Sequence, residues 1–233
     1  MKILHIAGSP KGERSASRKL ADVFLRRYRA LHPGHEIGAI DVFDAAANPD
    51  FGAVHAIHKL APLFGEERSE AGTVAWVDTE RLIADFDRAD KILLSCPMWN
   101  YSVPWAVKRY LDHLMQPGRT FGFDPATRQH FGLLRDRPVQ FILTRSSTGD
   151  DDPGDFQLPY LLHIFRQMGL HDIRVINACK TTKATAPERL AYLDSFTPEL
   201  EAAAARFERP ALDTASPCFF ACGIGPRVLD AAL

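Results

Sequence analysis

Three hydroxyl side chains crowd a short glycine-containing segment near the N-terminus. Residues 8–17 read GSPKGERSAS and place Ser9, Ser15 and Ser17 between an apolar run and an amphipathic pattern. Each hydroxyl could donate a hydrogen bond to a phosphate oxygen, and the amides of a helix N-terminus favour an anion at the same place. The segment matches neither G-x-G-x-x-G nor G-x-x-x-x-G-K-[ST], because a glutamate follows its second glycine. Serine is also a common helix cap, so a purely structural role for Ser15 or Ser17 stays open.

A second segment, CPMWNYSVP at residues 96–104, combines aromatic rings, an asparagine and two further prolines. It follows an apolar run, and we expect Pro104 to be the first residue of a helix, where proline is tolerated. A rigid turn of this kind exposes backbone amides and ring faces, which together suit a flat heterocycle. Core packing is the more common fate of Trp and Tyr, but Asn100 between two rings is poor core material.

Other groupings of reactive side chains give weaker signals. His55 and His58 are three residues apart, but no cysteine or carboxylate stands at a metal-binding spacing, which favours surface histidines. Three residues separate Cys218 from Cys222, so the pair is neither a redox C-x-x-C nor half of a usual zinc site. The acidic run at 150–152 precedes a Pro-Gly turn and is typical of a solvated loop. The sequence therefore predicts no metal site.

Apolar runs alternate with amphipathic stretches along the chain, which predicts a doubly wound parallel sheet with helices on both faces. We expect strands at 3–7, 36–42, 91–96, 138–144 and 173–178, and helices at about 15–32, 76–87, 104–115, 156–168 and 187–207. Residues 120–137 read as an excursion with a small hairpin. Ligands of such sheets bind beyond the carboxyl ends of the strands. This rule selects the loops after Ala7, Cys96 and Thr144.

Composition excludes several classes of protein. The chain has 233 residues, 46% of them hydrophobic and 24% charged, with a formal net charge of -1. A nearly neutral protein has no field that attracts nucleic acid, and no apolar run here reaches the length of a membrane span. We read no signal peptide at the N-terminus. Four cysteines in a chain of this length do not form a disulfide framework, so we expect a soluble cytoplasmic protein with reduced thiols.

The two informative segments, together with two later ones, resemble the flavodoxin-like NAD(P)H dehydrogenase (quinone) and FMN-dependent azoreductase family. The matching parts are GSPKGERSAS, PMWNYSVPWAVKRYLD, RTFGFDP and LPYLLHIFRQMGLHDIRVI, and together they span residues 1 to about 179. The resemblance implies a flavodoxin-like fold with five parallel strands in the order 2-1-3-4-5. It also implies an FMN-binding domain over residues 1–209, followed by a tail of unknown role at 210–233.

The resemblance assigns cofactor-binding residues in the first two loops. The serines of the family's first loop match Ser9, Ser15 and Ser17, with Ala16 between the last two, and these would hold the FMN phosphate. The family's flavin-edge motif matches Pro97, Met98, Trp99, Asn100 and Tyr101. Trp99 stands where the family usually has tyrosine, a change that keeps the aromatic face.

The third loop departs from the family pattern. Relatives carry a Ser-Arg-Gly-Gly-like or Thr-Gly-Gly-like turn against the pyrimidine side of the flavin, whereas this chain has Thr144, Arg145, Ser146 and Ser147. Serines in place of glycines make positive φ angles less comfortable, although their hydroxyls could still bind the flavin. Arg145 either brings positive charge to the pyrimidine end or lies at the surface, paired with an aspartate of the run at 150–152.

The implied function is reduction of a quinone or azo compound by NADH or NADPH through bound FMN, with FAD as the less expected flavin. The flavin does the redox chemistry and both substrates share its exposed face, so we expect ping-pong kinetics and no catalytic side chain. The family's flavin pocket is completed by a second subunit, which makes residues 156–168 and the region of Phe121 and Phe123 candidate dimer surfaces. A flavodoxin-type electron carrier is the alternative, although carriers are usually shorter and strongly acidic. A second alternative is a flavin-free α/β binding protein that has lost the site.

Overall fold

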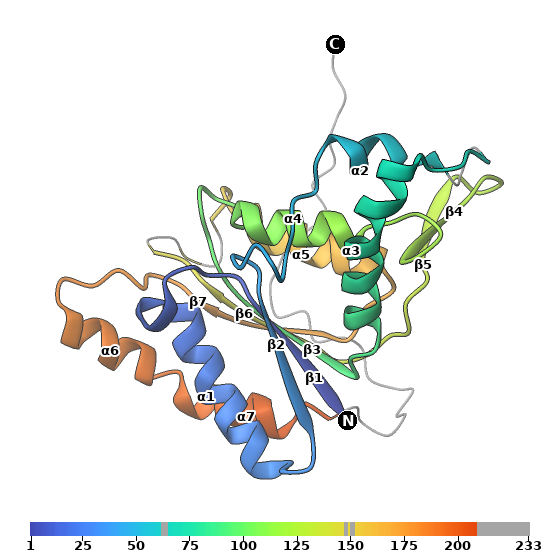
Figure 1. The fold of residues 1–233 in the computed structure, drawn as a ribbon. Helices are drawn as coiled ribbons and strands as arrows, with labels where there is room; N and C mark the ends of the chain where they lie inside the picture. The colour runs from blue at the N-terminus through green and yellow to red at the C-terminus, as the bar shows by residue number, and fades with distance from the viewer. Residues whose placement is uncertain (62–64, 147–148, 150–151, 209–233) are drawn as a thin grey trace.

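A computed structural model of the protein describes residues 1–61, 65–146, 149 and 152–208 (Figure 1). These residues form one α/β unit with a central sheet. The predicted tail at 210–233 and Ser147 lie outside the described residues, and so does part of the acidic run. The domain division at residue 210 therefore stays a prediction.

The central sheet has five parallel strands in the order β2-β1-β3-β6-β7. Leaving aside the two strands of a separate hairpin, this is the expected order 2-1-3-4-5, and the fold prediction is confirmed. The strands are β1 (Lys2–Ala7), β2 (Glu36–Asp41), β3 (Lys91–Pro97), β6 (Val139–Thr144) and β7 (Ile173–Ala178). A separate antiparallel hairpin of β4 (Phe121–Asp124) and β5 (Gln129–Gly132) confirms the predicted excursion.

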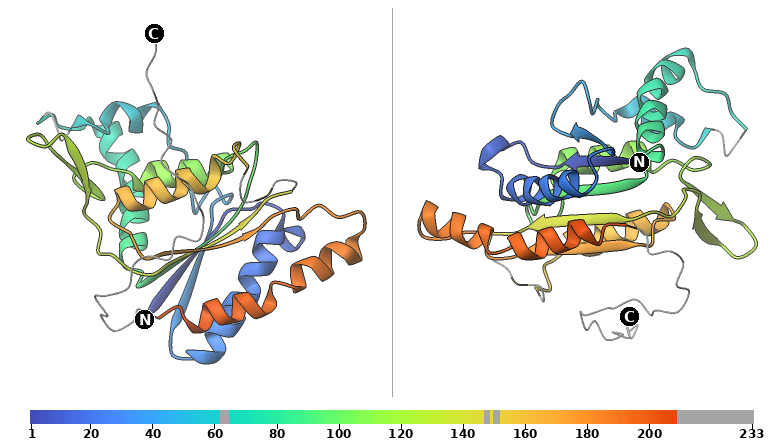
Figure 2. Two further views of the ribbon diagram at one scale, coloured as in Figure 1. Left: turned by 180° about the vertical axis from the view of Figure 1, so that it is seen from behind. Right: turned by 90° about the horizontal axis from the view of Figure 1, so that it is seen from below.

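Helices cover both faces of the sheet, because each buried strand sends alternate apolar side chains to opposite sides. On β1, Ile3 packs with one helix group, whereas Leu4 and Ile6 pack with the other. The first group is α1 (Ala16–Leu31), α6 (Ala186–Asp194) and α7 (Thr197–Ala205). The second group is α3 (Glu70–Asp87), α4 (Trp105–Leu114) and α5 (Gln157–Gln167). Figure 2 shows the sheet between the two groups. A short helix α2 (Ala53–His58) packs on α3.

Several helix boundaries differ from the sequence prediction. The single helix expected at 187–207 is two helices, because Pro198 has no amide hydrogen to continue the first and instead lies in the opening turn of α7. Helix α3 begins at Glu70, six residues earlier than expected, where the Ser69 side chain accepts a hydrogen bond from Gly72 N. Pro104 is the residue before α4 rather than its first residue.

Across the described part of the chain, no helix has both the length and the apolar content needed to cross a membrane. His55 and His58 have different surroundings. The His55 ring is buried and stacks on Phe51, while His58 lies within hydrogen-bonding distance of Ser69. The prediction of two surface histidines is therefore wrong for His55, which is buried beside Phe51, whereas His58 is partly exposed.

Candidate functional site

The register of the sheet places the three selected loops side by side at its carboxyl rim. Ala7 pairs with Ser95, and Pro97 pairs with Thr144, so β1, β3 and β6 end close to the same level. Beyond the strands, hydrogen bonds continue across the rim. Gly8 N donates to Ser95 O over 2.8 Å, and Met98 N donates to Thr144 O over 2.7 Å. The loops are therefore fixed relative to one another by backbone bonds.

Gly8 allows the first loop to lie close to its neighbours. A methyl group at this position would lie 2.8 Å from Val107 Cγ2 on α4 and 3.0 Å from Ser95 O on β3. The first distance is shorter than real Cβ contacts and the second is tighter than most of them, so only glycine fits without movement of the loop or of α4. The glycine thus brings the start of α1 next to the second loop.

The hydroxyls of the first loop gather at the N-terminus of α1. Ser15 caps this helix by accepting a hydrogen bond from Arg18 N over 3.2 Å, and its Oγ lies 3.2 Å from Ser17 Oγ. Ser9 and Ser17 are buried with it. The capping role left open by the sequence is therefore real for Ser15. It does not exclude anion binding, because a hydroxyl has one donor and two acceptor sites, and the first helix amides, those of Ala16 and Ser17, have no intrahelical acceptor.

A buried histidine lies on β1, just before this loop. His5 Nε2 lies 2.9 Å from Ser95 Oγ, and both side chains are buried between β1 and β3. Burial, together with a smaller effect of the nearby Arg18 charge, lowers the pKa of His5 to about 4. The ring is therefore neutral near pH 7 and adds no positive charge to the rim.

The second loop is a tight turn with unusual backbone angles. Trp99 and Ser102 exchange both backbone hydrogen bonds, over 2.9 and 3.0 Å, as the flanking residues of a two-residue hairpin turn. The central residues Asn100 and Tyr101 have φ angles of 45° and 69°. This left-handed pair is the pattern of a type I′ turn, which asparagine adopts at lower cost than tyrosine. Such strain costs about 1–3 kcal/mol per residue and is concentrated at functional sites.

The start of α5 supports this strained turn. Phe156 N donates to Tyr101 O over 2.9 Å. A methyl group on Gly154 would lie 3.1 Å from Tyr101 Cδ1, so the absence of a side chain there lets the ring pack against the backbone. The carbonyl and the ring of Tyr101 are thus both held by the segment that begins α5.

Aromatic rings border a hollow beside the turn. The hollow has a volume of about 440 Å³ and is lined by Trp99, Asn100, Ser102, Val103, Pro104, Trp105, Lys108 and Tyr160. Phe43, which follows β2, lies between two of these rings, with centroid distances of 5.6 Å to both Trp99 and Trp105. Three rings in contact provide an apolar wall against which a flat molecule can stack.

Arg145 in the third loop is a buried cation with a carboxylate partner. Its side chain is 1% exposed, and its Nη2 lies 2.6 Å from Asp155 Oδ2, whose side chain is 9% exposed. Its Nη1 donates to Gly149 O over 3.1 Å. The surface position that the sequence left open for this side chain is therefore wrong. Placement of its charge near a flavin stays a prediction.

The Arg145–Asp155 pair ties the third loop to α5. The other oxygen of Asp155 accepts hydrogen bonds from Gln157 N and Leu158 N over 2.9 and 3.1 Å, which satisfies amides at the start of the helix. Gln157 Nε2 in turn lies 3.4 Å from Cys96 O, at the end of β3. One buried ion pair thus joins the third loop, α5 and the strand that carries the second loop.

The other third-loop residues lie at the same rim. Thr144 is the buried last residue of β6, and Ser146 O accepts a hydrogen bond from Thr182 N over 3.1 Å. The structure brings together the described predicted residues of all three loops, and their contacts with a flavin stay predictions. Sequence reasoning missed Phe43, Gly154, Asp155, Gln157 and Tyr160. Among these, only Asp155 carried a usable signal, since aspartate just before an apolar periodic stretch is a common helix start.

Comparisons with known proteins agree with this architecture. A family model described as a flavodoxin-like fold matches residues 1–197. The chain is 37% identical over 190 residues to an FMN-dependent NADH:quinone oxidoreductase of Nitratidesulfovibrio vulgaris (strain DP4). The aligned region covers 80% of this chain and 89% of the relative. It is 38% identical over 181 residues to FMN-dependent NADH:quinone oxidoreductase 2 of Pseudomonas syringae pv. tomato (strain ATCC BAA-871 / DC3000), spanning 76% of this chain and 85% of the relative.

Two solved structures have the same fold. The crystal structure of an FMN-dependent NADH-azoreductase from Bacillus anthracis str. Ames Ancestor, in complex with FMN, has a TM-score of 0.76 and 24% identity, covering 88% of this chain and 98% of that one. An azoreductase from Bacillus anthracis str. Sterne has a TM-score of 0.78 and 20% identity, covering 89% and 100%. At these identities the likeness establishes the fold of the chain.

Removal of the Arg145 side chain tests the role of the buried pair. Arg145→Ala leaves the Asp155 carboxylate buried without its partner, which we expect to lower the free energy of unfolding by about 3–5 kcal/mol. The matched control is Arg81→Ala, which breaks an exposed pair with Asp78 and should cost at most about 1 kcal/mol. Urea denaturation followed by circular dichroism measures both. Equal losses in the two variants would show that the buried pair does not hold the rim together.

Proposed function

Because the chain belongs to the flavodoxin-like fold family, we propose that it is an FMN-dependent NADH:quinone oxidoreductase, with azo compounds as a second class of acceptor. The single observation that carries the proposal is the strained turn Trp99–Ser102, held next to the N-terminus of α1 by the backbone bonds of the rim. The two relatives at 37% and 38% identity over most of the chain bear this activity in their names. They favour an enzyme over an electron carrier without its own substrate.

The residues present fit a phosphorylated flavin. The phosphate matches the first loop, where Ser15 Oγ and Ser17 Oγ lie 3.2 Å apart beside the opening amides of α1. The ring matches the second loop, where Met98, Asn100 and Tyr101 provide backbone groups and Trp99 provides an aromatic face. Thr144, Arg145, Ser146 and Ser147 would contact the pyrimidine end.

The chain contributes position and surroundings rather than a reacting side chain. When bound, FMN supplies the ring that accepts hydride from NADH and passes it to the acceptor. The wall of Phe43, Trp99 and Trp105 excludes water from one side of the hollow and stacks flat substrates. The Arg145–Asp155 pair keeps the turn and α5 in register with β3.

A reduction experiment without oxygen separates the enzyme from the carrier. The purified protein loaded with FMN is mixed with NADH alone, and the visible absorbance of the flavin is followed. We expect the flavin to bleach rapidly and its colour to return when a benzoquinone is added. In steady-state assays, we expect double-reciprocal plots of initial rate against substrate concentration to give parallel lines. A flavin that stays oxidised in NADH, yet is reduced by a separate reductase, would identify a carrier. Protein that takes up no FMN would contradict both functions.

We also propose that the protein is a homodimer whose interface covers the carboxyl rim. Large apolar side chains around the rim are exposed, with Tyr101 at 58%, Trp105 at 59% and Phe156 at 62%. On the β4–β5 hairpin, Phe123 and Phe131 are exposed at 47% and 50%. Patches of this kind in a folded protein commonly mark an interaction surface. Sedimentation of the FMN-loaded protein should give a dimer, and a fully active monomer that retains flavin would contradict this proposal.

We assign the flavin-binding domain to residues 1–209 and the protein to the cytoplasm. Cys96 forms no disulfide with any described residue, and burial raises the pKa of its thiol to about 12, which keeps it unreactive. These properties suit a reducing compartment. Recovery of the protein in a membrane or exported fraction after cell fractionation would overturn the assignment.

A further inference from the structure

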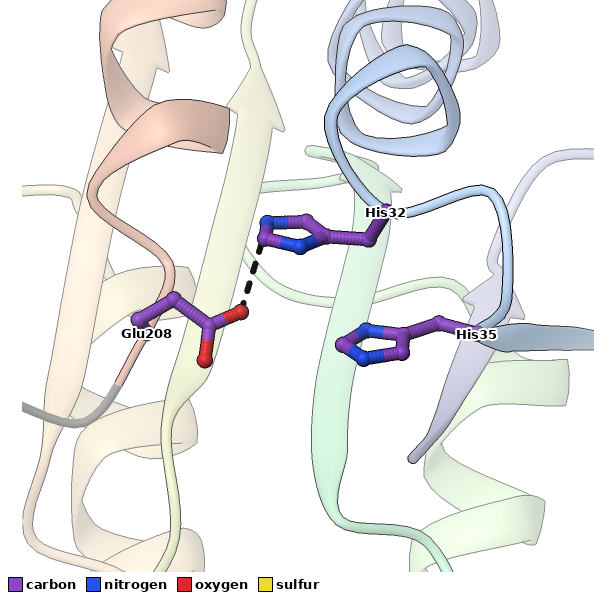
Figure 3. Close-up of side chains that lie close together, drawn as sticks. All are labelled: His32, His35 and Glu208. Carbon is purple, nitrogen blue, oxygen red and sulfur yellow. Dashed lines mark ion pairs between the residues drawn. The ribbon is translucent and has the colours of Figure 1, made fainter.

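Two histidines and a glutamate converge at the rim opposite the proposed flavin site. His32 follows α1, His35 lies in the turn before β2, and Glu208 lies beyond the end of α7 (Figure 3). His32 Nε2 is 3.3 Å from Glu208 Oε1, and the possible ligand atoms of all three side chains lie within 4.8 Å of one another. We propose that His32, His35 and Glu208 bind a divalent transition metal ion of the zinc type.

The set of ligands suits this class of ion. Two imidazoles and one carboxylate, with a remaining position for water, form a common zinc site, whereas magnesium and calcium prefer oxygen ligands alone. Neighbouring ligand atoms of a tetrahedral zinc site lie about 3.3 Å apart, so the most distant pair must approach. The two rings are parallel, with centroids 4.8 Å apart, and must rotate to direct their nitrogens at one point. All three residues are only partly buried, which permits this movement.

The backbone fixes the spacing of the two histidines. His32 N donates to Tyr28 O over 2.9 Å at the end of α1, and His35 N donates to His32 O over 3.0 Å across the following turn. The turn therefore holds both rings on the same side of the chain. Only the side-chain torsions need to change when an ion binds.

A second layer of contacts orients one of the ligands. His35 Nδ1 is 2.8 Å from Tyr28 OH, and Lys91 Nζ donates to the same hydroxyl over 3.0 Å. In the tautomer that carries hydrogen on Nδ1, His35 donates to Tyr28 and leaves Nε2 available to a metal. Histidine ligands commonly have this kind of partner on their other nitrogen, which fixes the tautomer and the ring orientation.

The carboxyl ends of two helices add an electrostatic potential that favours a cation at this cluster. Helices α1 and α7 both run opposite to the strands, so their carboxyl ends reach the amino-terminal rim beside the cluster (Figure 1). The C-terminus of a helix carries a partial negative charge that stabilises a cation within about one turn. His32 caps α1 directly, and Glu208 is three residues beyond the last residue of α7.

The N-terminal ammonium acts on His35, and the Lys91 ammonium is the opposing charge in direct contact with Glu208. Lys91 Nζ lies 2.5 Å from Glu208 Oε1, and the Lys91 side chain is only 3% exposed. The rings of Tyr28 and Phe207 also hold it, with centroid distances of 5.0 and 5.7 Å. The second oxygen of Glu208 remains available for a metal, but the neighbouring charge must weaken binding. We therefore expect that removal of the Lys91 charge raises the affinity for the metal ion.

The sequence alone could not assemble this cluster. His32 and His35 have the three-residue spacing that was discounted for His55 and His58, and their carboxylate partner is 173 residues further along the chain. Only the packing of α7 beside α1 brings Glu208 to the histidines.

Zinc titration of the FMN-loaded protein tests the proposal. The protein is first stripped with a chelator and then titrated with Zn²⁺ against a chromophoric chelator. We expect one equivalent to bind, with affinity lowered at least about tenfold in His35→Ala and in Glu208→Gln, since each removes one ligand. The matched control is His171→Ala, which removes an exposed histidine near the same rim and should leave the affinity unchanged. Flavin content and circular dichroism check that each variant is folded.

Two further readouts complement the titration. Lys91→Met should raise the affinity for Zn²⁺, because the opposing charge is gone. Co²⁺ added to the wild-type protein should give visible absorption bands of a four-coordinate ion, and these bands should be absent in His32→Ala. A wild-type protein that binds no Zn²⁺, or one whose affinity falls as much in His171→Ala as in His35→Ala, would overturn the proposal.

Discussion

Backbone hydrogen bonds across the carboxyl rim of the sheet hold the candidate site together. The bonds from Gly8 N to Ser95 O and from Met98 N to Thr144 O extend the parallel ladder past the ends of the strands. Because parallel strands end at the same edge, three separate parts of the chain meet there without any long connecting structure. Gly8 is the residue that permits this, since any side chain would press on α4 and β3.

The rim contains local strain that its surroundings maintain. Asn100 and Tyr101 adopt left-handed angles that a free chain would avoid. The bond from Phe156 N to Tyr101 O and the Asp155 contacts at the start of α5 keep the turn in place. Arg145 is buried where it can neutralise Asp155 rather than face solvent. A preformed turn of this kind avoids the entropic cost of ordering a loop when a ligand binds.

The sequence predicts the fold well because its signals are local and periodic. The five strands, their order and most helices follow from apolar runs such as KILLSCP and from the family resemblance. The single helix expected at 187–207 is wrong because the alanine-rich sequence favours helix on both sides of Pro198, where a proline opens a second helix. The partner of Arg145 was not predictable, since the adjacent acidic run offered closer choices than Asp155. Phe43 was missed because contacts with Trp99 and Trp105 depend on tertiary packing alone.

The central claim is that the first loop holds a phosphate while the second holds the attached ring. Calorimetric titration of the flavin-free protein with FMN and with riboflavin, which lacks the phosphate, tests this most directly. The account predicts that FMN binds at least about tenfold more tightly, since hydrogen bonds to a charged group contribute about 1.5–3 kcal/mol each. Ser17→Ala should reduce this preference, whereas Ser195→Ala, at the distant end of α6, should not. Equal affinities for the two flavins in the wild-type protein would contradict the account.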